Sequence, residues 1–195
     1  MRFESAILYF LCLPTVFAVT TSPKRGLIYI PNSSFPADNN VWGESGSDLT
    51  WYYNYKVTPS PAPPSTTLQF VPMMWGAPAT LSDTTFLTTV QSLLSAGTNI
   101  THVLGFNEPD GTSVTGGSNV SPVVAAQLWK TNIEPLKAKG VHLGAPAVTG
   151  SQRGLTWLQN FFTACNGGCS ADFLPIHYYG DFSGLASYMG QVNAT

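Results

Sequence analysis

The chain has 195 residues, and only 9% of them are Asp, Glu, Lys or Arg, against roughly 25% in ordinary soluble domains. The formal net charge is −2, and the sequence has no basic cluster that would bind nucleic acid or an anionic membrane surface. Aromatic residues make up 12% of the chain. This composition favours a neutral ligand, because Trp and Tyr rings offer flat apolar faces on which a sugar can stack.

The first residues are typical of a secretory signal peptide. Arg2 provides a positive start, residues 6–13 are apolar, and Val16-Phe17-Ala18 resembles a signal-peptidase cleavage site. A membrane anchor is the weaker alternative, because Pro14 interrupts the apolar run well short of the ~20 residues that span a bilayer. We therefore expect residues 1–18 to be removed and residues 19–195 to form one domain of a secreted protein without a membrane anchor.

The cysteines and glycosylation motifs agree with export. Cys12 lies in the expected signal peptide, so Cys165 and Cys169 remain as an even pair, and a local disulfide is expected. Two cysteines alone cannot build a tetrahedral zinc site, and no metal or cofactor is expected. Asn-x-Ser/Thr motifs begin at Asn32, Asn99, Asn119 and Asn193, although Pro122 directly after the third disfavours its use.

Strand-like and helix-like segments alternate from residue 26 onward. Strands are predicted over 26–31, 51–57, 68–75, 102–107, 141–148 and 172–179. Helices are predicted over 83–96, 122–139, 155–165 and 182–192. Ser82 or Asp83 should cap the first of these helices, and Pro122 and Gly140 should begin and end the second.

This alternation predicts an α/β fold with a parallel sheet and helices outside it. Six units at this spacing indicate about three quarters of a (β/α)8 TIM barrel. The alternative is an open doubly wound sheet, but its usual Gly-rich turn after the first strand is replaced here by Pro31-Asn32-Ser33. The Pro-rich stretch 58–66 resembles an interdomain linker. Because the segment 24–57 before it is too short to fold alone, we expect a stiff loop within one domain.

The most informative stretch is Leu104-Gly105-Phe106-Asn107-Glu108-Pro109-Asp110. An apolar strand leads directly to Glu108, and Pro109 ends the strand because it lacks an N–H group. Catalytic groups of parallel barrels lie at the carboxyl ends of strands, so Glu108 is the candidate acid/base. The alternative is a helix cap or a salt-bridged surface acid, which the scarcity of basic residues nearby disfavours.

Cleavage of a glycosidic bond needs two carboxylates, and a second one is hard to find. Glu44 is expected in a loop and Glu134 late in a helix. Asp110 is expected to cap a loop. Asp181, just after the sixth strand, is the nearest stand-in, but none of these is convincing as the partner of Glu108.

Aromatic residues recur where the predicted strands end: Tyr52, Tyr53, Tyr55, Trp75, Tyr178 and Tyr179. Core packing is the default for any one of them, but for Trp75 and Tyr179 a sugar-stacking cleft is an equal alternative. His177 is either a hydrogen-bonding partner of a substrate or nucleophile, or a core histidine. His102 and His142 begin strands and are expected to be structural.

The motifs KRGLIYIP, WYYNY, FVPMMWG, HVLGFNEPD, LGAPAVT and DFLPIHYYG follow one another from residue 24 to about residue 190. Together they resemble the catalytic core of glycoside hydrolase family 128, the alkali-sensitive-linkage-protein-like glycosyl hydrolases. The resemblance implies a retaining β-1,3-glucanase acting on fungal-type wall glucan, outside the cell or in the cell wall. It implies Glu108 as acid/base. Asn107, Asn54, Tyr55, Trp75, His177 and Tyr179 are the candidate substrate-binding residues, with Asn107 at the sugar 2-hydroxyl.

Two departures from the family pattern stand out. The family nucleophile is a Glu on the seventh strand, in a Thr-Glu-Phe-like motif that has no counterpart here, and Tyr55 stands where Trp is common. We therefore expect a catalytic domain that stops before its seventh strand and lacks appreciable hydrolase activity. The alternatives are a glucan-binding relic without turnover and a gene product that never forms a stable barrel.

Overall fold

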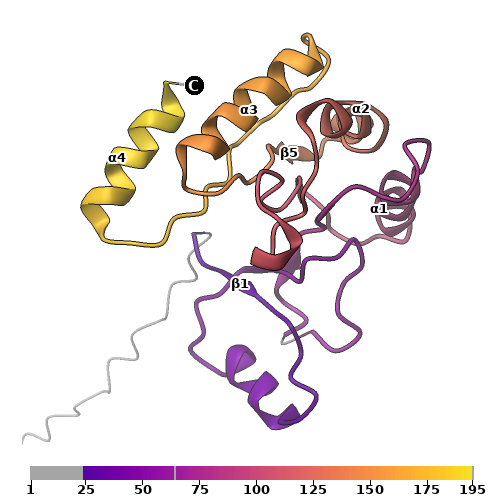
Figure 1. Ribbon diagram of the computed structural model, residues 1–195. Coiled ribbons are helices and arrows are strands. Elements are labelled where there is room, and N and C mark those ends of the chain that lie inside the picture. Colours follow the sequence, from indigo (N-terminus) through magenta and orange to yellow (C-terminus); the bar gives the residue numbers. More distant parts are fainter. Residues whose placement is uncertain (1–23, 64, 195) are drawn as a thin grey trace, which may run out of the picture.

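The computed structural model describes residues 24–63 and 65–194 (Figure 1). The expected signal peptide, residues 1–18 with Cys12, lies outside the described residues. Within the described part of the chain, none of the helices combines the length and the apolar character needed to cross a membrane.

The strands are parallel and follow one another in chain order. One sheet contains β1 (Gly26–Ile28), β2 (Trp51–Tyr53) and β3 (Gln69–Phe70), and a second contains β4 (His102–Leu104) and β5 (His142–Gly144). Single parallel bridges join Met73 to Leu104 and Gly144 to Phe173. The parallel order therefore continues through all six predicted strand segments, which confirms the parallel α/β class. The closer assignment, an incomplete (β/α)8 barrel with about six of its eight units, stays a prediction.

The strands are shorter than the sequence predicted, and proline explains much of the difference. Pro72, Pro146 and Pro175 each lie inside a predicted strand and lack the N–H group that a sheet needs. The sixth segment forms no regular strand: it pairs only at Phe173, two residues before Pro175.

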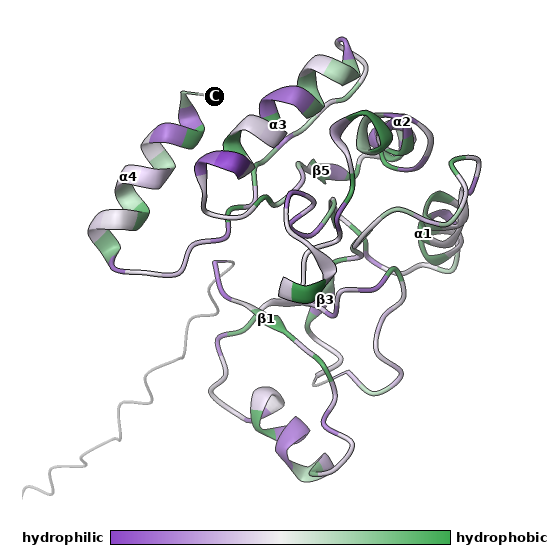
Figure 2. Cartoon of the chain, viewed as in Figure 1, coloured by the Kyte–Doolittle hydropathy of each residue, from purple (hydrophilic) through white to green (hydrophobic). Residues whose placement is uncertain are grey.

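The four predicted helices are present. They are α1 (Thr85–Ser95), α2 (Pro122–Asn132), α3 (Gln152–Cys165) and α4 (Phe182–Asn193), which follow one another in an arc around one side of the strands (Figure 1). Ser121 and Ser151 cap α2 and α3, because their side chains accept hydrogen bonds from Val124 N–H and Gly154 N–H. Figure 2 shows α3 with alternating hydrophobic and hydrophilic bands, as an amphipathic helix should have.

The part of the chain that the structure describes also contains the 3-10 helices η1 (Pro36–Gly43), η2 (Ser113–Thr115) and η3 (Glu134–Lys139). The predicted helix 122–139 is split into α2 and η3, because Pro135 has no N–H group to continue the α-helical pattern. Gly140 ends η3 with a φ of 77°, as predicted for a helix stop. Glu44 lies in the loop directly after η1, so its predicted loop position is confirmed.

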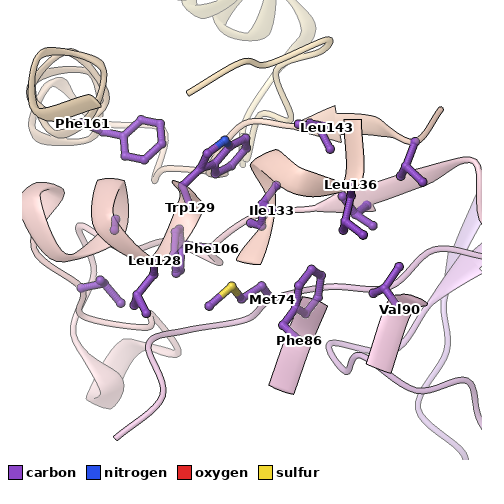
Figure 3. Close-up of a cluster of buried hydrophobic side chains, with 14 of the residues drawn as sticks. Met74, Phe86, Val90, Phe106, Leu128, Trp129, Ile133, Leu136, Leu143 and Phe161 are labelled. Carbon is purple, nitrogen blue, oxygen red and sulfur yellow. The ribbon is translucent and has the colours of Figure 1, made fainter. Parts of the chain in front are cut away.

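The core lies between the strands and helices α1 to α3 (Figure 3). Trp129 of α2 and Phe161 of α3 are fully buried, with ring centroids 5.5 Å apart. Phe106, directly before Asn107 and Glu108, is buried in the same cluster. Truncating such a side chain typically costs about 3–5 kcal/mol. The packing of Phe106 therefore fixes the chain just after β4, where it leads to Glu108, the candidate acid/base.

The predicted disulfide is present between Cys165 and Cys169, whose Cα atoms are 5.5 Å apart. Asn166 and Gly167 both have left-handed backbones, with φ of 47° and 78°, and they end α3. The turn between the two cysteines therefore has the conformation that Asn and Gly adopt most readily.

Candidate active site

Glu108 lies at the carboxyl end of β4, with an uncommon backbone conformation. Its φ is 41°, in the left-handed region, which costs a residue with a side chain roughly 1–2 kcal/mol. Its N–H group donates to the carbonyl of Ala147 at 2.7 Å, and its carbonyl accepts from Gly111 N–H at 2.8 Å. The turn is thus held to the segment after β5 on one side and to its own loop on the other.

The Glu108 side chain contacts an imidazole. Oε1 lies 2.7 Å from Nδ1 of His177, a residue 69 positions further along the chain. The two side chains are only 17% and 21% exposed. Oε2 makes no hydrogen bond to any described residue, so one carboxyl oxygen is held while the other is free to exchange a proton with a ligand. The contact brings the predicted His177 directly to the predicted acid/base.

Asn107 is buried beside Glu108 and presents an unused acceptor. Its backbone N–H donates to the carbonyl of Trp75 at 2.9 Å, and its side-chain Nδ2 donates to the carbonyl of Gly116 at 3.1 Å. Its Oδ1 is buried without a hydrogen-bond partner among the described residues, as is Oγ of Ser118. An unsatisfied buried acceptor costs about 1–3 kcal/mol, so this oxygen lacks the compensation that buried acceptors usually have within a protein.

Tyr55 and Trp75 come together in one pocket of about 510 Å3, which Lys56 and Asp83 also line. Trp75 is 38% exposed, and the Tyr55 ring meets the face of Tyr53 at 5.1 Å between centroids. Burial raises the pKa of Tyr53, and its hydrogen bond with Tyr55 raises it further, so Tyr53 is a neutral phenol at physiological pH. The aromatic residues that line this pocket are Tyr55, Trp75 and Phe86, beside the charged Lys56 and Asp83.

The other two predicted contacts lie differently. The buried Asn54 uses its side chain locally: Oδ1 accepts from Lys56 N–H at 3.1 Å, and Nδ2 donates to the carbonyl of Thr58 at 3.0 Å. Asn54 thereby shapes the loop that carries Tyr55. Tyr179 is 92% exposed, although it lies close enough to raise the pKa of Tyr53 slightly, after burial and Tyr55.

Every other carboxylate in the described residues is exposed or engaged away from Glu108. Asp181, expected as the nearest stand-in nucleophile, instead caps α4 by accepting from Gly184 N–H at 2.7 Å and from the Ser183 hydroxyl at 3.0 Å. Asp110 was expected to cap a loop, and in the structure its carboxylate accepts a hydrogen bond from Thr149 N–H. Four others are engaged elsewhere: Asp48 pairs with Arg25, Asp83 accepts a hydrogen bond from Thr85, Glu134 accepts from Trp129 and Ser170, and Asp172 accepts from Leu143. Asp38 and Glu44 are exposed on the surface.

His102 and His142 lie side by side at the amino ends of β4 and β5, whereas Glu108 lies beyond the carboxyl end of β4. They face each other in the β4–β5 register, with ring centroids 5.0 Å apart. Burial lowers the pKa of His102, and the neighbouring His142 lowers it further. Within residues 24–63 and 65–194, no cluster of three or more His, Cys, Asp or Glu side chains could hold a metal ion.

Comparison with known proteins places this geometry in a family. A family model described as glycosyl hydrolase catalytic core matches residues 26–195. Alkali-sensitive linkage protein 1 of Schizosaccharomyces pombe is 31% identical over 176 residues, which are 89% of this chain but 29% of that protein. The chain therefore spans less than a third of the length of this relative.

Solved structures are similar over most of the chain. A curdlan-specific exo-β-1,3-glucanase from Blastomyces gilchristii, of glycoside hydrolase family 128, has a TM-score of 0.70 and 30% identity, over 88% of this chain and 68% of that chain. An endo-β-1,3-glucanase of the same family from Lentinula edodes has a TM-score of 0.63 and 28% identity, over 88% and 66%. The chain therefore belongs to the glycosyl hydrolase catalytic core family and, within it, to glycoside hydrolase family 128.

Proposed function

We propose that this chain carries the acid/base half of a β-1,3-glucan hydrolase, with Glu108 as the acid/base. The observation that supports this most directly is the arrangement of Glu108 itself: a left-handed residue at a strand end, bonded through Oε1 to His177 and free at Oε2. The similar enzymes from Blastomyces gilchristii and Lentinula edodes are described as β-1,3-glucanases, which supports the choice of substrate.

In this reaction Glu108 gives its proton to the glycosidic oxygen as the bond from that oxygen to the anomeric carbon breaks. In the retaining form, a second carboxylate about 5–5.5 Å away attacks the anomeric carbon, and the first then removes a proton from water. The hydrogen bond from His177 fixes the carboxyl group in place for both steps. The free Oε2 is the oxygen that would carry the transferred proton.

The surroundings of Glu108 suit a glucan. The buried, unpartnered Oδ1 of Asn107 can accept a hydrogen bond from the 2-hydroxyl group of the sugar at the cleavage point. Trp75 joins this centre to the adjacent 510 Å3 pocket, because Asn107 N–H bonds to its carbonyl while Trp75 also lines the pocket. Tyr55 and Trp75 would stack on further glucosyl units there.

The place of action follows from the same proposal. The signal-like residues 1–18 and the Cys165–Cys169 disulfide support export to the cell surface or wall, where glucan is found. The sequon asparagines Asn32, Asn99, Asn119 and Asn193 are all exposed, as glycosylation would require. The proposed partner is therefore a β-glucan polysaccharide or oligosaccharide.

A second function, glucan binding without cleavage, is favoured by one specific observation. None of the other carboxylates in the described residues is directed at Glu108, and Asp181 is committed to capping α4. Because cleavage needs two carboxylates, we propose that these residues bind glucan but do not hydrolyse it alone.

The test combines binding and turnover on the purified chain. Calorimetric titration with laminarihexaose should show binding. A reducing-end assay on curdlan should show no turnover by this chain, with the curdlan-specific enzyme from Blastomyces gilchristii as the positive control. Absence of binding would refute the glucan proposal. Turnover that is lost in Asp181→Asn would show that Asp181 is the second carboxylate.

A further inference from the structure

The turn that carries Glu108 is anchored by a buried carboxylate two residues further along. The Asp110 side chain is 1% exposed. One of its oxygens accepts from Thr149 N–H at 2.9 Å, and the other accepts from the Thr149 hydroxyl at 2.5 Å. Arg153 Nε lies 3.6 Å from the same carboxylate. Charge-assisted hydrogen bonds in a buried setting are strong and directional, so Asp110 fixes the turn to the loop between β5 and α3.

Thr149 is itself held from two further directions. Its carbonyl accepts from the Tyr188 hydroxyl of α4 at 3.2 Å and from Ser151 N–H at 2.7 Å. Its hydroxyl also lies 2.8 Å from the hydroxyl of Ser151, the residue that caps α3. Asp110 therefore attaches the Glu108 turn to a point where the β5 loop, α3 and α4 meet.

The Glu108 turn needs such an anchor, because its left-handed backbone is not one that glutamate adopts readily. The loop that folds back over it leaves no room for adjustment. A Cβ atom added at Gly117 would lie 2.5 Å from the carbonyl carbon of Gly111 and 2.7 Å from the carbonyl oxygen of Glu108. A shift of this turn would carry the Glu108 carboxylate away from His177.

We propose that Asp110 is a positioning residue for Glu108: acting through Thr149, it holds the Glu108 carboxylate against the His177 imidazole. The chemical meaning of this role rests on the proposed function of Glu108 as acid/base. The geometric role can be tested without any glucan, so the two proposals can fail separately.

Substitutions at Thr149 separate position from charge. Thr149→Val removes the hydroxyl that Asp110 accepts from but leaves the Asp110 charge in place, whereas Asp110→Asn removes the charge. Thr149→Ser keeps the hydroxyl and should restore the wild-type state. Asp181→Asn is the matched control, since it removes a carboxylate that caps α4 and has no bond to Thr149.

The readout is the imidazole nitrogen spectrum of the whole chain. Only three histidines are present, so a long-range proton–nitrogen correlation spectrum resolves each ring, and His177→Gln assigns the signals of His177. In Thr149→Val and Asp110→Asn these signals should shift toward their positions in Glu108→Ala. They should stay in place in Thr149→Ser and Asp181→Asn, and the signals of His102 and His142 should not move in any variant.

Circular dichroism identifies the variants that fold. If both Thr149→Val and Asp110→Asn unfold, Tyr188→Phe replaces them in the test. This variant removes only the hydroxyl that bonds to the Thr149 carbonyl, and it should shift the His177 signals in the same direction. Unchanged His177 signals in every folded variant would overturn the proposal. So would equal shifts of His177, His102 and His142, because these would indicate a general loosening of the fold.

Discussion

Glu108 combines two features that rarely occur together in a surface carboxylate. It has a left-handed backbone, and it has a 2.7 Å contact to an imidazole that is itself largely buried. Strained residues of this kind persist where the surroundings fix them, and they are frequent at active sites. At Glu108 the surroundings are visible: Ala147 and Gly111 hold the backbone, and Asp110 holds the turn.

Trp75 provides the residue-scale test of the sugar pocket. Trp75→Ala should weaken laminarihexaose binding by about 1.5–3 kcal/mol, the contribution of burying a large apolar side chain. Phe162→Ala is the control, because Phe162 is equally exposed at 38% but lies on α3, away from the pocket. Calorimetric titration measures both affinities. Equal losses in the two variants would contradict a stacking role for Trp75.

At the scale of elements, Glu134 joins α2 to the segment after α3. Burial raises the pKa of Glu134, but the hydrogen bonds from Ser170 and Trp129 outweigh it, so the pKa is lowered overall. A carboxylate with a lowered folded-state pKa adds stability above its unfolded pKa and loses that contribution as pH falls through the folded value.

Glu134→Gln should therefore lower the free energy of unfolding at neutral pH, while below the folded pKa of Glu134 the difference from the wild type should vanish. Urea unfolding at a series of pH values measures this. A deficit that stays constant down to acidic pH would show that the charge of Glu134 contributes nothing.

The Cys165–Cys169 disulfide closes a very short loop at the end of α3. In the chain-entropy model, a loop of this length gives about 2 kcal/mol of stabilisation. Replacing both cysteines by alanine should lower the free energy of unfolding by no more than this, and chemical denaturation measures the change. Mass spectrometry of the unreduced chain should first find the bridged peptide; two free thiols would contradict the structure.

Sequence reasoning predicted the elements well where local chemistry decides them. Pro122 and Gly140 mark real helix boundaries, and Glu108 does follow a strand. The split of the helix at Pro135 could have been predicted from the missing N–H group. The Glu108–His177 contact could not, because it joins residues 69 positions apart. Asp181 was the nearest stand-in for a second carboxylate but not a convincing one, and in the structure it caps α4.

At the scale of the whole molecule, the sheet has an open side. Within the described residues β1 pairs only with β2, and the sixth segment pairs only at Phe173. Ile28 at the end of β1 and Ile30 just after it are exposed, and Figure 2 shows β1 as a hydrophobic stretch. Unpaired apolar edges promote association between chains.

We therefore expect the purified chain to self-associate as its concentration rises. Ile30→Lys should reduce the association, since a charged side chain at an edge opposes pairing. Val114→Lys is the control, because Val114 is exposed on η2 and is not part of β1. Analytical ultracentrifugation measures the effect. A chain that remains monomeric at high concentration would show that this edge is already covered.

An external nucleophile tests most directly whether these residues hold the acid/base of a glucan hydrolase without a second carboxylate directed at it. Azide can take the place of the missing carboxylate: it attacks the anomeric carbon of an aryl β-laminarioside, the bond to the phenol oxygen breaks, and Glu108 supplies the proton to that oxygen. Phenol release should require azide, should yield the glycosyl azide, and should fall roughly 10²–10⁴-fold in Glu108→Gln for a weakly acidic phenol. Release without azide, or azide-dependent release that Glu108→Gln leaves unchanged, would contradict this proposal.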